Sequence, residues 1–149
     1  MSSIRKNPWL TFLALCFGFF LIILDTTIVN IAIPSIMNDL HTGLDTILWV
    51  LSAYTLAYTT LLVTAGRLGE FLGQRKLFIT GLILYILAVI SCGFSGNAIQ
   101  LILARVFQGI GAALLAPQTL AILTTLFPRE RRGIVFGAWS AVAGVAAIT

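Results

Sequence analysis

The sequence predicts an all-α integral membrane protein built as a bundle of transmembrane helices. Of its 149 residues, 59% are hydrophobic and 9% are charged, and the mean hydropathy is +1.04. A typical soluble domain is about 25% charged. The apolar runs are long enough for transmembrane helices, which need about 20 residues. The alternating pattern of outer-membrane strands, about 10 residues each, is absent from the sequence.

Four complete candidate spans and a fifth, interrupted one cover most of the chain. They occupy approximately residues 9–33, 46–65, 77–94, 99–120 and 133–149. Short loops between successive spans predict that neighbouring helices run antiparallel. Pro34 is expected to end or kink the first helix, and Pro117 to bend the fourth.

The last span has small residues spaced four apart, at Gly133, Gly137 and Ala141, which is typical of closely packed membrane helices. Such a face requires a neighbouring helix, and little of this chain is left to supply one. We therefore expect residues 1–149 to be the N-terminal transmembrane segment of a larger protein whose further helices are missing.

The basic residues alternate between loops. All but one lie before the first span or in the second and fourth loops, at Arg5, Lys6, Arg67, Arg75, Lys76, Arg129, Arg131 and Arg132. The other loops, residues 34–45 and 95–98, hold no Lys or Arg. By the positive-inside rule the N-terminus is cytoplasmic and the chain crosses the cell (cytoplasmic or inner) membrane several times. The basic residues are not gathered into one patch, so the net charge of +4 does not indicate that the protein binds nucleic acid.

Two charged residues, Asp25 and Arg105, lie inside the predicted spans. Such a residue costs about 2.5–3.5 kcal/mol on insertion scales, so it usually has a function. Asp25 lies about 24 Å along the helix from Trp9 at the cytoplasmic side, and Arg105 about 9 Å from Ile99 at the external side. In an apolar core about 30 Å thick both have a similar depth, and we expect them to face a shared cavity.

A carboxyl group in this position can load and release a proton, because burial favours its neutral form and a nearby guanidinium favours its ionised form. The alternative is a static pair that fixes helix register. Gln108 lies one turn from the arginine and can bond to it or to a substrate. Gly109 and Gly111 can simply allow close packing. Thr27 can bond its own backbone.

A second polar cluster, GRLGEFLGQRKLF, spans residues 66–78. Its glycines predict a tight turn between antiparallel spans, across which Glu70 can pair with Arg75 or Lys76. The alternative is that these charges only anchor the helix ends among the lipid headgroups. A phosphate-binding loop is not supported, since no strand precedes the glycines.

These motifs resemble the major facilitator superfamily, and within it the 14-helix drug:proton antiporter group. The segment 66–78 is similar to the signature between helices 2 and 3, matching at Gly66, Leu68, Gly73 and Arg75, with Glu70 in place of Asp. LILARVFQGIGAA is similar to the helix-4 signature, matching at Arg105, Gln108, Gly109 and Gly111. LDTTIVNIAIP resembles the helix-1 signature, matching at Asp25, Thr27, Asn30, Ala32 and Pro34. WVLSAYTL, with Trp49 and Tyr54, resembles that group's second helix.

The resemblance implies a secondary transporter that exports drugs or amphiphilic, cationic compounds by alternating access. It implies that Asp25 binds protons or substrate, that Arg105 couples proton movement to conformational change, and that the segment 66–78 holds one state. It implies no enzymatic activity and no cofactor, since the proton gradient supplies the energy. The alternatives are a metabolite symporter of the same fold and a small non-transporting scaffold or regulatory protein with five spans.

Overall fold

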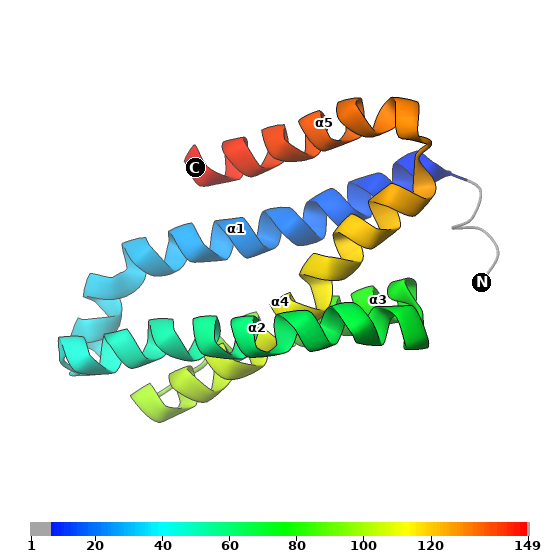
Figure 1. Ribbon diagram of the computed structural model, residues 1–149. Coiled ribbons are helices and arrows are strands. Elements are labelled where there is room, and N and C mark those ends of the chain that lie inside the picture. Colours follow the sequence, from blue (N-terminus) through cyan, green and yellow to red (C-terminus); the bar gives the residue numbers. More distant parts are fainter. Residues whose placement is uncertain (1–6, 149) are drawn as a thin grey trace.

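The computed structural model describes residues 7–148, which form five α-helices (Figure 1). The helices are α1 (Pro8–Asp39), α2 (Leu44–Leu72), α3 (Gln74–Gly93), α4 (Ala98–Leu126) and α5 (Arg129–Ile148). The first four are long and apolar enough to cross a membrane, so the predicted all-α membrane fold is confirmed. Arg5, Lys6 and Thr149, which entered the sequence-based topology, lie outside the described residues.

Helix α4 is the centre of the bundle. It packs along α2 and α3 and also contacts α1 and α5, while α5 lies mainly beside α1 (Figure 1). The most apolar stretch of α4 is 50% buried inside the protein, whereas those of α1 to α3 are between 17% and 28% buried. The helices around α4 therefore keep most of their apolar surface on the outside, where a bilayer can cover it.

Two glycines of α4 allow this close packing. A Cβ atom added at Gly109 would lie 2.9 Å from the Cβ of Ala57 on α2, and one at Gly111 would lie 2.8 Å from the backbone nitrogen of Tyr85 on α3. Neither approach leaves room for a larger side chain. The glycines that the sequence placed in a packing role thus lie against opposite neighbours of α4.

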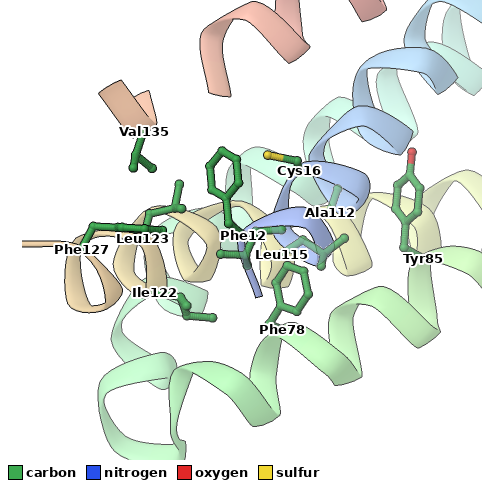
Figure 2. Close-up of a cluster of buried hydrophobic side chains, with 11 residues drawn as sticks. Phe12, Cys16, Phe78, Tyr85, Ala112, Leu115, Ile122, Leu123, Phe127 and Val135 are labelled. Atoms are coloured by element: carbon green, nitrogen blue, oxygen red, sulfur yellow. The ribbon is translucent and has the colours of Figure 1, made fainter. Parts of the chain in front are cut away.

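The α2–α3 and α4–α5 turns, which carry the basic residues and are called the basic turns below, lie at one end of the bundle. A cluster of buried apolar side chains fills this end (Figure 2). Phe12 of α1, Phe78 of α3, Leu123 of α4 and Val135 of α5 belong to it. The rings of Phe12 and Phe127 meet edge to face with centroids 6.1 Å apart. This end of the bundle is therefore closed by apolar contacts.

The helices extend beyond the predicted spans. Helix α1 does not end at Pro34 but continues to Asp39, so the predicted loop 34–45 shrinks to residues 40–43. A proline inside a helix removes one hydrogen bond and bends the axis, and Figure 1 shows α1 changing direction towards its C-terminal end. Helix α4 likewise continues through Pro117, with a change of direction along its length (Figure 1).

The segment 66–78 is not the loop that the sequence predicted. Helix α2 runs to Leu72 and α3 begins at Gln74, so only Gly73 separates them. Gly73 has a φ of 96°, which a residue with a side chain rarely adopts. Gly66, Leu68 and Glu70 are therefore helical residues of α2. The sequence analysis overestimated the turn because it assigned three closely spaced glycines to it, of which only Gly73 lies between the helices.

We predict that Gly109→Val destabilises the full-length protein by about 1–3 kcal/mol, as overpacking of a close contact does. A thermal unfolding assay in detergent should show the lower midpoint. Gly93→Val is the matched control, because nothing lies within 4 Å of a Cβ at Gly93. Equal midpoints for the two variants would contradict the packing described for α4.

Candidate functional site: a charged pair beneath a cavity

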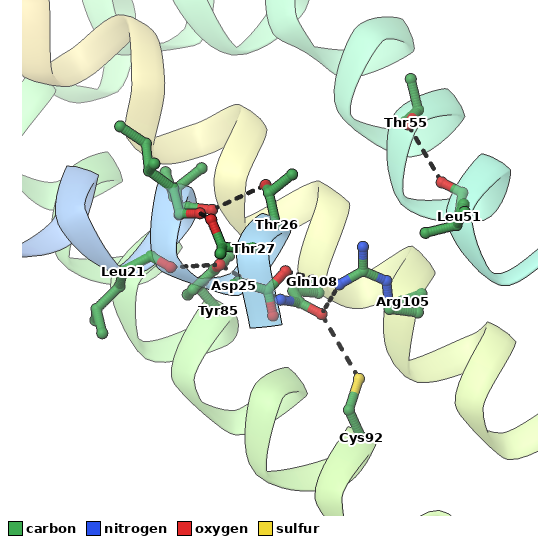
Figure 3. A network of polar contacts seen from close by, with 12 residues as sticks. Leu21, Asp25, Thr26, Thr27, Leu51, Thr55, Tyr85, Cys92, Arg105 and Gln108 are labelled. Carbon is green, nitrogen blue, oxygen red and sulfur yellow. Dashed lines mark hydrogen bonds and ion pairs between the residues drawn. The ribbon is translucent and has the colours of Figure 1, made fainter. Parts of the chain in front are cut away.

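Asp25 of α1 and Arg105 of α4 form an ion pair inside the bundle (Figure 3). Nη1 of Arg105 donates a hydrogen bond of 2.8 Å to Oδ2 of Asp25. The Arg105 side chain is 5% exposed and the Asp25 side chain 14%. No other acid–base pair within residues 7–148 is closer than 4.0 Å. The matching depths estimated from the sequence thus correspond to a direct contact.

Two further groups surround the Arg105 guanidinium. Nη1 also donates a bond of 2.8 Å to Oε1 of Gln108, one turn along the same helix. The guanidinium carbon lies 4.5 Å from the ring centroid of Tyr54 on α2, an arrangement in which the ring face attracts the cation. Nε of Arg105 is buried and has no hydrogen-bond partner among the described residues. Residues of three helices therefore carry or contact the charge, and its buried Nε–H donor has no partner among the described residues.

Gln108 connects the pair to α3 (Figure 3). Its Nε2 donates to the Tyr85 hydroxyl at 3.4 Å, and that hydroxyl donates to the carbonyl of Leu21 on α1 at 3.3 Å. The thiol of Cys92 lies 3.6 Å from Oε1 of Gln108. Gln108 is fully buried. All four membrane-spanning helices therefore contribute to one polar network.

A cavity of about 370 Å³ reaches this network from the other end of the bundle. Its polar lining comes from Asp25, Arg105, Gln108, Cys92, Ser95 and Asp39, and its apolar lining includes Ile28, Ile36, Val50 and Val89. Asp39 ends α1 and Ser95 follows α3, so the cavity lies towards the end opposite the basic turns. Ligand sites commonly have such a volume, with apolar walls and a few polar groups.

The other residues of the helix-1 motif lie outside the network. The Thr27 hydroxyl donates to the carbonyl of Ile23 in its own helix at 3.4 Å, as the sequence suggested. Asn30 and Pro34 are exposed on α1. Their place in the motif therefore has no explanation within the described part of the chain.

The expected pairing of Glu70 with Arg75 or Lys76 is not found. All three side chains are exposed, and within residues 7–148 none of them has an ion-pair partner closer than 4.0 Å. Ion pairs at an exposed surface gain little free energy, which removes the reason for these side chains to pair. They lie in the last turn of α2 and the first turn of α3.

Sequence reasoning missed three residues that the structure joins to the polar contacts. Tyr85 and Cys92 of α3 belong to the network. Gln118 of α4 is buried and bonded to α2. Tyr and Gln inside an apolar run were the available signal, since buried polar groups require partners.

Comparison with known protein families identifies the family of this chain. The sequence profile of the Major Facilitator Superfamily matches residues 15–149. The chain belongs to this superfamily. The family expected from the motifs is thus confirmed, and its helices make the chain a multi-pass membrane protein.

The relatives of the chain are longer transporters. An uncharacterized MFS-type transporter of Mycobacterium tuberculosis is 49% identical over 99% of this chain and 25% of its own length. The tetracenomycin C resistance and export protein of Streptomyces glaucescens is 38% identical over 96% of this chain and 27% of its own length. The riboflavin transporter of Clostridioides difficile is 34% identical over 94% of this chain and 31% of its own length. The chain thus spans about a quarter to a third of these relatives.

We predict that Asp25→Asn destabilises the full-length protein by about 3–5 kcal/mol, because it leaves the buried Arg105 without its counter-charge. Combining it with Arg105→Gln should recover most of this loss. Thermal unfolding of the single and double variants measures both effects. Losses that simply add in the double variant would show that the two side chains do not interact.

Proposed function

We propose that the full-length protein is a proton-driven exporter of amphiphilic, cationic compounds in the cell membrane. The observation that carries the proposal is the ion pair at the inner end of an apolar-walled cavity. Among the described lining residues two are acidic, Asp25 and Asp39, and one is basic, Arg105. Such a cavity suits a compound with an apolar body and a positive charge.

Competition for one carboxylate supplies the coupling in this proposal. Arg105, a proton and a cationic substrate each neutralise the Asp25 carboxylate, and each excludes the others. Protonation of Asp25 removes its attraction for Arg105, whose guanidinium keeps its contacts with Gln108 and Tyr54. Because α1 and α4 meet through this pair, its formation and loss would favour different arrangements of the two helices.

The direction of the cavity follows from the basic turns. If these turns are cytoplasmic, as the positive-inside rule predicts, the cavity described here opens towards the outside. The apolar cluster would then close the cytoplasmic side (Figure 2). Alternating access would require the rest of the full-length protein to form the other wall and to rock against this one.

Export is favoured by the relative named for tetracenomycin C resistance and export. The relative named as a riboflavin transporter keeps transport of a metabolite as the second candidate. The family match favours either over a non-transporting scaffold. The sign of the pH gradient that drives transport distinguishes an exporter coupled to proton entry from a symporter.

We predict that full-length protein in inverted vesicles takes up a fluorescent lipophilic cation when the vesicle interior is acid, and that Asp25→Asn abolishes this uptake. The reason is that the neutral amide neither binds a proton nor attracts a cation.

Asp45→Asn is the matched control, because Asp45 is an exposed residue in the first turn of α2 outside the cavity. Transport that persists in Asp25→Asn at equal protein amounts would contradict the proposed coupling. Transport driven only by the opposite gradient would favour the symporter.

A further inference from the structure

A second buried polar contact joins α2 and α4 near the basic turn, far from the charged pair. Nε2 of Gln118 donates a hydrogen bond of 2.8 Å to the carbonyl oxygen of Ala65. Both residues are 1% exposed. A primary amide buried in an apolar region is costly unless it is bonded, so this contact specifies how α2 and α4 sit against each other.

The two glycines that precede the turn fit around this contact. A Cβ added at Gly69 would overlap the side-chain amide of Gln118, and one added at Gly66 would lie 3.8 Å from the Cβ of Pro117. The absence of a side chain at Gly69 therefore serves the amide of α4, not the turn itself. Gly69 is therefore needed for packing and not for its backbone conformation, because among the described glycines only Gly73 has a positive φ.

Pro117 places this contact at a weak point of α4. A proline has no backbone N–H, so the carbonyl of Ala113 lacks its usual donor and the helix bends there. Arg105 precedes this point and Gln118 follows it, about 20 Å apart along the helix at 1.5 Å per residue. The first part of α4 is thus joined to α1 through Asp25 and to α2 through Tyr54, and the second part is joined to α2 through Ala65.

We infer that Gln118 is a positioning residue that fixes α2 and the α2–α3 turn against the second part of α4, and so links the turn to the Asp25–Arg105 pair. The inference rests on the proposed transport function. It assigns the bond to the conformation described here, in which the cavity opens away from the basic turns. Loss of the bond should therefore depopulate this conformation without altering the cavity.

The test uses full-length protein in which Cys92 is the only cysteine, because Cys92 lines the cavity. A membrane-impermeant maleimide applied outside intact cells then reports how often the cavity is open. We expect Gln118→Ala to slow labelling per molecule about threefold to tenfold, the population change that one net hydrogen bond produces. Thr119→Val is the control, since Thr119 is equally buried but bonds only Leu115 of its own helix.

A double-variant cycle tests the fit to Gly69. Gly69→Ala should slow maximal transport of the lipophilic cation about tenfold with an unchanged KM, as expected for an overpacked contact away from the cavity. Adding Gln118→Ala should restore the rate to that of Gln118→Ala alone, because the shortened side chain leaves room for the new methyl group.

Equal labelling in Gln118→Ala and wild type, or losses that add in the double variant, would overturn the inference. A role in folding alone would lower the amount of protein and leave labelling per molecule unchanged. Absence of transport by the wild type would overturn the proposed function instead, and the labelling would still test Gln118.

Discussion

The cost of holding ionised groups in an apolar interior governs this helical bundle. Neither Asp25 nor Arg105 is tolerable there by itself, since each would lose its hydration without gaining a counter-charge. Together they form one short contact, while Gln108 accepts a second hydrogen bond from Arg105 and the Tyr54 ring lies against its guanidinium. The contact joins α1 to α4, and the residues around it bring in α2 and α3. The arrangement of the four membrane-spanning helices near the cavity thus depends on keeping this pair together.

The pair works because α4 is narrow where the neighbouring helices cross it. Gly109 and Gly111 let α2 and α3 approach from opposite sides, so that Tyr54 and Tyr85 reach the residues of α4 that carry the charge and the amide. Aromatic and aliphatic side chains fill the space between the helices at one end of the bundle, and the cavity lies towards the other end. One half of the bundle is therefore packed for stability, while the other provides a polar surface within reach of a ligand.

The sequence alone predicted the features that depend on charged residues within apolar runs. An acid and a base in apolar runs must find each other, and counting residues from the membrane surfaces put them at the same depth. It placed the uncharged Gln108 beside Arg105 but did not find Tyr85 or Cys92, because their polar partners lie on other helices and only the fold identifies them. Of the two outcomes expected at Pro34, an end or a kink, the helix does not end there but continues to Asp39. Gly66 and Gly69 were assigned to a turn but lie in α2 facing α4, since tertiary contacts outweigh local propensity there.

The central claim is that a proton and a cationic compound compete for the Asp25 carboxylate. The most direct measurement is proton release by purified full-length protein in a weakly buffered solution when a lipophilic cation such as tetraphenylphosphonium is added. The account predicts that wild type releases protons on binding and that Asp25→Asn releases none. Proton release of the same size from Asp25→Asn would place the exchange on another group and contradict the account.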